Sequence, residues 1–301
     1  MNSMLKSSVS IARALKGIIR IIGKNNKIKI GFCIFLALLI VGFASPYINR
    51  LRIGDKRPHD LGVGRRWEQP SIKFPLGTDD YGRDIFGMLL VGIMYSLSIG
   101  LLAGAIATLI AVTMGFISGY KGGFVDHTLR TFTDTLLVIP LWPIYMAIAT
   151  YIPKLPLESV ALLLGIFSWP GAARVIRAQV LSLKERAFVK LAKLNMLNDL
   201  EIVFLELLPN IAPYIIIGFI NSVMGAIFAE TGLRLIGIGP PLLPTLGYLL
   251  SITIGVGMLS VRPYVVAAVV GVLALIFISL NLINIGLEEE FNPRLKKVTG
   301  L

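Results

Sequence analysis

The side chains best suited to chemistry in this chain are acidic and basic residues that stand four positions apart. On a helix such residues lie one above the other, so they form ion pairs or hydrogen-bonded clasps. Glu230 ends an apolar stretch, where an ionisable group needs a partner or water, and Arg234 follows one turn later. This pair fits either a surface ion pair or a gating element. We interpret two further sets as structural clasps: Asp79, Arg83 and Asp84, and Asp126, Arg130 and Asp134.

Catalytic chemistry is excluded by what the sequence lacks. No nucleotide-binding motif of the form G-x-x-x-x-G-K-[ST] is present, so the chain should not bind ATP itself. Its only histidines are His59 and His127 and its only cysteine is Cys33, which leaves no metal cluster, disulfide or nucleophilic triad in the sequence. We therefore expect no catalytic residue, no metal site and no cofactor in this chain.

A charged, amphipathic segment, residues 190–210, lies between two long apolar stretches. Its apolar residues recur at helical spacing, with charged residues largely on the other side. The pattern predicts one continuous helix that is closed by Pro209, which should turn Leu208 out of helical geometry. This helix could lie on the inner membrane surface, or it could dock a cytoplasmic partner. The predicted apolar stripe is Leu191, Leu194, Leu197, Leu200, Val203, Phe204 and Leu207.

The elements that must position these residues are membrane helices, because hydrophobic residues make up 55% of 301 positions. The sequence predicts an all-α polytopic membrane protein with about six spans, each long enough to cross ~30 Å of hydrocarbon. A seventh apolar run, 242–259, contains Pro244 and three glycines and is better explained as interfacial or re-entrant. Gly100 and Gly104 form a G-x-x-x-G motif, which either allows close helix packing or reflects a spacing that is common by chance in apolar helices. The predicted spans are 29–48, 88–118, 135–152, 159–175, 210–229 and 263–286.

Basic residues predict the orientation of these spans. With the N-terminus inside, 18 of the 29 Lys and Arg residues flank the inner ends of the spans. The net charge of +12 is therefore a topology signal and not a nucleic-acid footprint. Both termini are expected in the cytoplasm of a plasma-membrane protein. The predicted segments are a basic amphipathic N-terminal segment 1–28, a first transmembrane helix 29–48, an extracytoplasmic loop 49–87, a transmembrane domain 88–286 with a cytoplasmic loop 176–209, and a cytoplasmic tail 287–301.

The extracytoplasmic loop 49–87 is rich in proline, glycine and charged residues, which is typical of an irregular but ordered loop. Gly77 and Gly82 permit tight turns in it. Thr78 and Asp79 are expected to cap the helix that follows. Basic residues are usually enriched in cytoplasmic loops, but a small folded element follows this rule less strictly than a flexible loop does. This explains the many basic residues of the loop 49–87.

Residues 190–210 resemble the cytoplasmic loop of binding-protein-dependent ABC importer permeases, whose pattern is E-A-A, three residues, glycine, and later Leu-Pro. Ala192 matches the second alanine, and residues 208–210 match the ending. Lys190 and Met196 replace the glutamate and the glycine. The resemblance implies a cytoplasmic coupling helix that contacts an ATPase through Lys190, Leu191, Ala192, Lys193, Leu194, Asn195 and Met196.

Four other motifs in the same order resemble the "C" permease subunits of the dipeptide/oligopeptide type. Residues 74–84 are similar to the signature P-L-G-T-D-x-x-G-R-D that precedes the second span. The remaining three are a G-G-x-x-D-x-x-x-x-R-x-x-D pattern leading to a proline, an A-E stretch followed by F-L-G-L-G, and a C-terminal N-L, G-L, D-P-R-L series. These correspond here to Gly122, Gly123, Asp126, Arg130, Asp134 and Pro140; to Ala229, Glu230 and residues 235–239; and to residues 281–282, 286–287 and 292–295.

The resemblance implies a permease subunit of an ATP-driven importer that forms half of a transmembrane pathway. The solute would be an oligopeptide or dipeptide, with oligosaccharide or nickel as alternatives for the same importer type. The implied partners are a homologous second permease subunit, two cytoplasmic ATP-binding subunits that hold ATP and Mg, an extracytoplasmic solute-binding protein and membrane lipids. Two other classes fit less well: an ion-coupled secondary transporter, which needs ionisable residues at mid-span, and a non-transporting membrane subunit.

Overall fold

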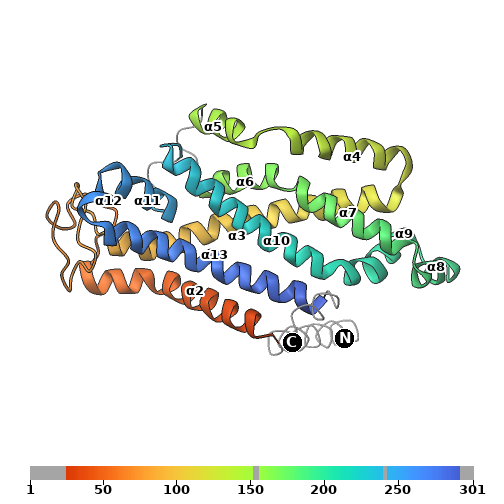
Figure 1. Ribbon diagram of the computed structural model, residues 1–301, viewed down its shortest axis with the longest axis horizontal. Coiled ribbons are helices and arrows are strands. Elements are labelled where there is room, and N and C mark those ends of the chain that lie inside the picture. The colour runs from red at the N-terminus through yellow and green to blue at the C-terminus, as the bar shows by residue number, and fades with distance from the viewer. Residues whose placement is uncertain (1–24, 152–155, 240–242, 292–301) are drawn as a thin grey trace. The chain divides into compact units, whose positions relative to one another are not determined.

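The computed structural model describes residues 25–151, 156–239 and 243–291, and the predicted all-α fold is confirmed there (Figure 1). One isolated bridge pairs Thr78 with Asp84 in the loop before α3. The predicted segment 1–28 and tail 287–301 lie largely outside the described residues. The elements are α2 (Asn26–Ile53), α3 (Ile85–Lys121), α4 (Gly123–Val138), α5 (Leu141–Tyr151), α6 (Leu157–Ser168), α7 (Pro170–Lys184), α8 (Ala187–Leu194), α9 (Asp199–Glu201), the π-helix η1 (Ile202–Leu207), α10 (Leu208–Leu235), α11 (Leu246–Gly255), α12 (Met258–Val261) and α13 (Pro263–Phe291).

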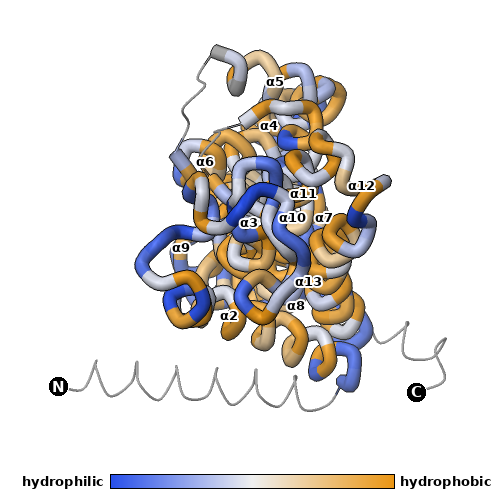
Figure 2. Tube along the Cα trace, turned by 90° about the vertical axis from the view of Figure 1, so that its left-hand side faces the viewer, coloured by the Kyte–Doolittle hydropathy of each residue, from blue (hydrophilic) through white to orange (hydrophobic). Residues whose placement is uncertain are grey.

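Among the described residues, four continuous helical stretches are long and apolar enough to cross a membrane, and two bent helix pairs raise the number to as many as six. The four stretches are α2, α3, the run that ends in α10, and α13. Hydrophobic residues run along these helices, whereas hydrophilic residues gather in the connecting loops (Figure 2). The predicted number of about six spans agrees with this range.

Proline explains both bent pairs. α4 and α5 meet at 77° around Pro140, and α6 and α7 meet at 46° where Pro170 begins α7. Proline removes a backbone donor and its ring clashes with the preceding turn, so a helix bends or restarts there. The predicted spans 135–152 and 159–175 are therefore broken helices.

The short helix α11 occupies the apolar run that we predicted to be interfacial or re-entrant. It has ten residues, which corresponds to about 15 Å of helix and is too short to cross the hydrocarbon. The Thr245 side chain caps it by accepting a hydrogen bond from the Tyr248 N–H at 3.0 Å. α11 packs against α3 and α10.

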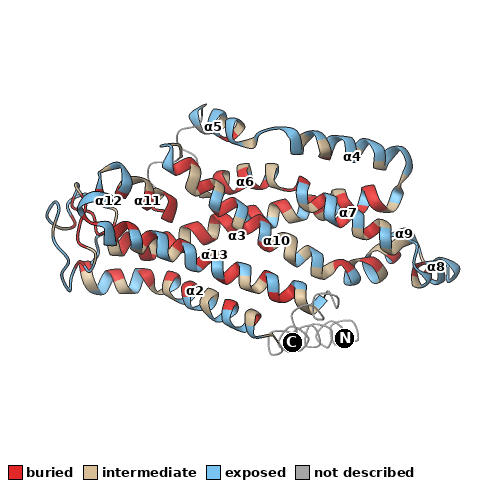
Figure 3. Cartoon of the chain, viewed as in Figure 1, coloured by how far each residue is buried: buried red, intermediate tan, exposed pale blue. Residues whose placement is uncertain are grey.

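Helix α3 forms the centre of the compact unit that spans residues 39–273, where it packs against α6, α7 and α10. Its buried face is rich in small residues, and Figure 3 shows it as the most continuously buried helix of that unit. Gly100 and Gly104 face Val223 and Ile227 of α10 at contact distance. The predicted role of the G-x-x-x-G motif in close packing is therefore confirmed.

Replacing Gly104 by alanine should lower the thermal stability of the purified chain. A Cβ there would lie 2.6 Å from a methyl group of Val223, and a β-branched side chain cannot easily swing aside. Overpacking of this kind costs about 1–3 kcal/mol. Gly225→Ala on α10 is the matched control, because a Cβ at Gly225 meets no described atom within 4 Å. Equal unfolding temperatures for the two variants in one detergent would contradict the packing argument.

The second compact unit joins the start of α2 to the end of α13, and its described part comprises residues 25–38 and 274–291. Gly31 brings the two helices together, since a Cβ there would lie 2.6 Å from the Ser279 carbonyl oxygen. Lys27 forms an ion pair with Glu289, and the Asn25 amide donates to the same carboxylate at 3.1 Å. A close glycine contact and a polar latch thus hold these two helix ends together.

Candidate docking surface and polar clasps

The docking segment, which we define as residues 187–207, consists of three short helices and not the single continuous helix that the sequence predicts. α8 ends at Leu194, α9 begins at Asp199, and η1 leads directly into α10. The expected break at Leu208 is also absent from this part of the chain. Leu208 has helical angles (φ −57°, ψ −45°), and Pro209 follows η1 inside a helical run that continues from Asp199 to Leu235.

Met196 ends α8 in the left-handed backbone conformation, with φ at 59°. Its N–H donates to the Lys193 carbonyl at 3.0 Å, and the N–H of Leu197 donates to the Ala192 carbonyl at 3.2 Å. These two bonds form a Schellman motif, which satisfies the last carbonyls of a helix and favours glycine at the left-handed position. Met196 thus takes the conformation that suits the glycine of the related pattern, at a cost of about 1–2 kcal/mol.

Asn198 starts the next helix with a capping box. Its side chain accepts a hydrogen bond from the Glu201 N–H at 2.8 Å, and the Glu201 side chain accepts one from the Asn198 N–H at 2.8 Å. Such reciprocal bonds satisfy two free donors at a helix N-terminus. A helix end and a helix start therefore enclose only Asn195 to Asn198, so the turn is held on both sides.

The residues of the docking segment that are buried differ from those of the predicted apolar stripe. The break between α8 and α9 is the reason, because it changes which residues share a face. Val189, Ala192, Ile202 and Leu207 are buried in a cluster with residues of α3 and α7. Ala192, expected to contact an ATPase, therefore packs inward. The outer side carries a group of exposed hydrophobic residues, shown in part by the pale blue of α8 in Figure 3. This exposed apolar set is Leu191, Leu194, Met196, Leu200, Phe204 and Leu205.

Met196→Gly should stabilise the turn by about 1 kcal/mol, since glycine adopts a left-handed conformation without steric cost. The expected result is amide exchange of the Leu197 N–H that is slower by roughly fivefold, because this donor is freed only when the Schellman motif opens. Met196→Ala is the control, as it shortens the side chain but keeps the strained backbone. Faster exchange in Met196→Gly would show that the turn is not strained.

Contacts with α3 hold the docking segment in place. The Tyr120 hydroxyl donates to the Asp199 carboxylate at 2.7 Å, and the Lys193 ammonium lies 5.8 Å from the centre of the Tyr120 ring. Both contacts join the end of α3 to the turn around Met196. Movement of the docking segment must therefore move α3 or break these contacts.

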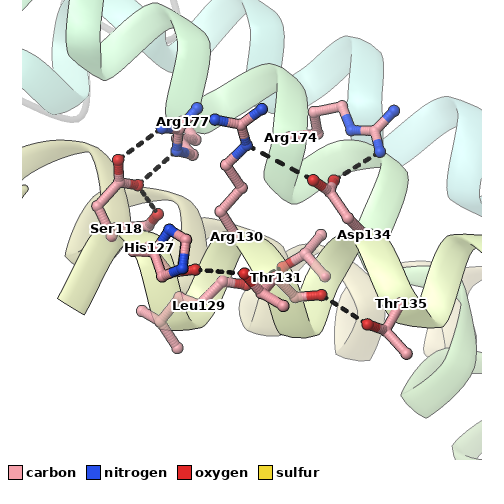
Figure 4. A network of polar contacts seen from close by, with 11 residues as sticks. Ser118, His127, Leu129, Arg130, Thr131, Asp134, Thr135, Arg174 and Arg177 are labelled. Carbon is pink, nitrogen blue, oxygen red and sulfur yellow. Dashed lines mark hydrogen bonds and ion pairs between the residues drawn. The ribbon is translucent and has the colours of Figure 1, made fainter. Parts of the chain in front are cut away.

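The predicted ladder of Asp126, Arg130 and Asp134 is only partly present. Arg130 and Asp134 approach within 3.5 Å, but Asp126 binds Arg177 of α7 through two bonds of 2.5 and 2.6 Å. The Arg174 side chain, also from α7, donates to Asp134 at 2.6 Å. Figure 4 shows the guanidinium groups of Arg177, Arg130 and Arg174 in a row along these helices. The network is thus a clasp between α4 and α7.

The loop before α3 contains the predicted clasp of Asp79, Arg83 and Asp84, but the pairing of Asp84 differs from the prediction. Arg83 pairs with Asp79 at 2.5 Å as expected, whereas Asp84 pairs with Arg52 of α2 at 3.1 Å. The capping expectation is wrong: Asp84 occupies the cap position of α3 without a side-chain cap bond. The Thr78 hydroxyl instead accepts from the Glu68 N–H at 2.8 Å within the loop.

Burial and ion pairing shift the pKa of two of these loop residues. Burial raises the pKa of the Asp84 carboxyl above its usual value, and Arg52 offsets this only in part. Burial opposes the charged form of Arg83, but Asp79 and Tyr248 outweigh it, so the pKa of Arg83 lies above its usual value. Arg83 therefore stays charged and holds the loop at any physiological pH.

Arg262, which precedes α13, anchors the same loop. Its guanidinium donates to the backbone carbonyls of Trp67, Glu68 and Thr78 at 2.6 to 3.1 Å and lies 5.4 Å from the Trp67 ring. Arg262 is buried, and Trp67 is held in a left-handed conformation with φ at 56°. An arginine that is distant in sequence thus fixes the loop through its backbone.

Glu230 and Arg234 form the predicted pair, but they are buried (3% and 5% exposed) and not at the surface. Arg234 Nε donates to Glu230 Oε1 at 2.9 Å, and the Thr245 hydroxyl donates to the same oxygen at 2.7 Å. The Arg234 guanidinium also lies 5.6 Å from the Tyr248 ring, whose hydroxyl accepts a bond from Arg83 at 2.8 Å. Polar contacts therefore connect the loop before α3, through α11, to the end of α10.

Sequence reasoning missed the partners that come from other helices. Each of them is an arginine, tyrosine or threonine whose partner lies far away in the sequence. Only the capping box had a readable signal, namely Asn198 followed three residues later by Glu201. The missed residues are Arg52, Arg174, Arg177, Thr245, Tyr248 and Arg262.

A bundle of apolar helices that carries an exposed docking segment at one end and a clasped loop at the other defines a membrane-embedded subunit of a larger assembly. The chain belongs to the family of binding-protein-dependent transport system inner membrane components, which matches residues 111–297. The matched region begins in α3 and includes the docking segment, α10 and α13.

Curated relatives agree with this family. The oligopeptide transport system permease protein OppC of Mycobacterium tuberculosis H37Rv is 35% identical over 78% of this chain and 80% of its own length. The OppC protein of Lactococcus lactis subsp. lactis is 29% identical over 91% of this chain and 93% of its own. The dipeptide transport system permease protein DppC of Alkalihalophilus pseudofirmus is 29% identical over 91% and 88%.

A solved structure supports the fold. A chain of the inward-facing MetNI methionine ABC transporter superposes with a TM-score of 0.51, covering 68% of this chain and 95% of the other. The two sequences are 17% identical, so this likeness concerns the fold alone.

Proposed function

We propose that this chain is the permease subunit of an ATP-driven ABC importer and forms half of a transmembrane pathway for dipeptides or oligopeptides. The exposed apolar set on the docking segment carries this proposal. Six hydrophobic side chains project from α8, α9, η1 and the capped turn between α8 and α9. Exposed apolar residues on a rigid frame are typical of a surface that binds another protein. The named relatives support peptides as the solute.

The partner at this surface is an ATP-binding subunit, which we expect on the cytoplasmic side together with both chain termini. Two such subunits would hold ATP and Mg, because this chain lacks a nucleotide-binding motif. A homologous second permease would complete the pathway, and a solute-binding protein would dock on the clasped outer loop. We place the whole assembly in the plasma membrane, with lipids around its apolar helices.

Helix α10 provides the mechanical link in this proposal. It runs without a break from Leu208, next to the docking segment, to Leu235, beyond the buried pair of Glu230 and Arg234. At 1.5 Å per residue its 28 residues span about 42 Å. Closure of the ATP-binding subunits would tilt this rod, and η1 would absorb the change, as π-helical turns often do at functional sites.

A cavity of about 440 Å³ beside α10 suits the solute side of the pathway. It lies between α10 and the broken helices around Ser168 and Leu141. Small residues leave room there beside apolar side chains, which suits an extended peptide better than a charged ion. These small residues are Ser168, Gly171, Gly218, Ser222 and Gly225.

Reconstitution tests this function directly. The chain, its sibling permease, the ATP-binding subunits and the solute-binding protein should together take up a labelled short peptide into proteoliposomes only when ATP is hydrolysed. Uptake is also measured with a proton or sodium gradient and no ATP. An ion-coupled transporter would take up the peptide under that condition, whereas an ATP-driven importer would not. Peptide uptake driven by the gradient alone would refute the importer assignment.

A further inference from the structure

A polar cavity of about 470 Å³ lies between α3, α4 and α7, apart from the docking segment and the solute-side cavity. Its charged lining consists of Arg130, Arg174, Arg177 and Asp134. Ser118 and Thr133 add hydroxyl groups, and Met114, Gly115 and Ala173 complete the wall. The lining therefore contains three arginines and one aspartate, which favours an anion.

Each of the three arginines has at least one guanidinium nitrogen that takes no part in its ion pair with an aspartate. The Nε atom of Arg130 lies 3.5 Å from the Asp134 carboxylate. Within residues 25–151, 156–239 and 243–291, the two terminal nitrogens of Arg130 form no ion pair. Arg174 uses one terminal nitrogen on Asp134, and Arg177 keeps one nitrogen beyond the two that bind Asp126. The side chains of Arg130 and Arg174 are 62% and 59% exposed. Planar guanidinium donors arranged in this way bind phosphate oxygens well.

The position of the cavity indicates which phosphate would reach it. α3 has 37 residues and spans about 55 Å, so its last turns extend beyond ~30 Å of hydrocarbon into the headgroup layer. Met114 and Ser118, which line the cavity, lie within about 10 Å of the end of α3 at Lys121. The cavity is therefore at headgroup depth, whichever side of the membrane this end faces.

The exposed surface of α4 carries large apolar side chains among polar ones, which are His127, Thr128, Thr131 and Thr135. Phe124 and Val138 are 84% and 83% exposed, and Phe132 is half exposed. Acyl chains can cover such a surface, whereas a soluble phosphate would leave it bare. A basic pocket between membrane helices, with an apolar flank, is the arrangement that binds anionic lipid headgroups.

We propose that this cavity binds the phosphodiester headgroup of an anionic phospholipid, with Arg130 and Arg174 as the phosphate ligands and acyl chains along α4. Asp134 then limits affinity, because its carboxylate competes with the phosphate for the same two guanidinium groups. Bound lipid would brace α4 against α7, in addition to the direct ion pairs. This inference does not depend on which solute is carried.

The test uses the full chain in nanodiscs of phosphatidylcholine with a small fraction of phosphatidylglycerol, followed by detergent extraction and mass spectrometry of the retained lipid. Arg130→Gln with Arg174→Gln should lower retained phosphatidylglycerol on the order of tenfold. Asp134→Asn should raise it severalfold, a change of sign that a purely structural clasp would not produce. If the double variant does not fold, Arg130→Gln alone is tested, because it removes only the 3.5 Å contact to Asp134. Retained phosphatidylglycerol should again be lower than in wild type.

Arg65→Gln with Arg66→Gln, in the loop before α3, is the charge-matched control and should retain as much phosphatidylglycerol as the wild type, because both residues are exposed and neither lines this cavity. Equal retention by wild type and the double variant would overturn the proposal. Millimolar inorganic phosphate or a free tripeptide should not release the lipid. Release by phosphate would identify a soluble anion as the natural occupant, and release by the tripeptide would assign the cavity to the solute, so either result would refute lipid binding.

Discussion

Replacing Leu191 and Leu194 together by aspartate should release the ATP-binding subunits from the complex and abolish ATP-driven uptake. Both side chains are exposed, at 59% and 78%, and belong to the exposed apolar set of the docking segment. Burying a leucine contributes about 1.5–3 kcal/mol, so losing two of them weakens binding by roughly 100-fold or more. Unpaired carboxylates in an apolar interface add a further penalty. The measurement is co-purification of the ATP-binding subunits with the tagged permease.

A matched double variant, Leu61→Asp with Ile72→Asp, separates docking from a general loss of apolar surface. These two residues are also highly exposed, but they lie in the loop before α3. Co-purification of the ATP-binding subunits should survive in this control. Ala192→Asp provides a second contrast, since it would unfold α8 from within and should speed amide exchange throughout α8. Full assembly of the Leu191 and Leu194 variant would show that the docking surface lies elsewhere.

Arg234→Met should destabilise the chain by about 3–5 kcal/mol, because it leaves the Glu230 carboxylate buried without its ion-pair partner. Adding Glu230→Gln should recover most of that loss, since the double variant no longer contains a buried charge at this point. Thermal unfolding in detergent measures both effects. Arg50→Met removes an exposed pair with Asp55 and is the control, with an expected change below about 1 kcal/mol.

The double variant at Glu230 and Arg234 also isolates the functional role of the pair. If the pair links the loop before α3 to α10, the solute-binding protein should stimulate ATP hydrolysis less in this variant than in wild type, although the variant is folded. Basal hydrolysis should remain, because the docking segment is untouched. If the solute-binding protein stimulates ATP hydrolysis equally in the folded double variant and in wild type, the role of Glu230 and Arg234 is structural only.

The membrane helices could be predicted from sequence because their signal is local. Apolar length is a property of a single stretch of chain, and it was sufficient to locate the spans, although the bends at Pro140 and Pro170 were not predicted. Pairing at four-residue spacing was predicted for the same reason, as Glu230 with Arg234 and Asp79 with Arg83 show. The partners of Asp126 and Asp84 come from α7 and α2, and nothing near either acid in the sequence indicates them.

The docking segment shows why a regular pattern can mislead. Its leucines fit one helical stripe from 191 to 207, yet the structure divides them among α8, the turn that follows it, α9 and η1. Local hydrogen bonds decided the outcome: the Schellman motif at Met196 ends one helix, and the Asn198 capping box begins another. Periodicity assumes an unbroken helix, so it cannot register such a break.

The exposed side chain of Met196 bears on which subunits can be exchanged between transporters. It projects from a fixed turn, 93% exposed, at a position where the related pattern has glycine and therefore no side chain at all. An ATP-binding subunit shaped to lie flat against glycine would meet a thioether in its way. A subunit with a recess for Met196 would in turn leave a void against glycine. If the docking segment binds an ATP-binding subunit as proposed, we expect Met196 to limit which ATP-binding subunits fit this chain.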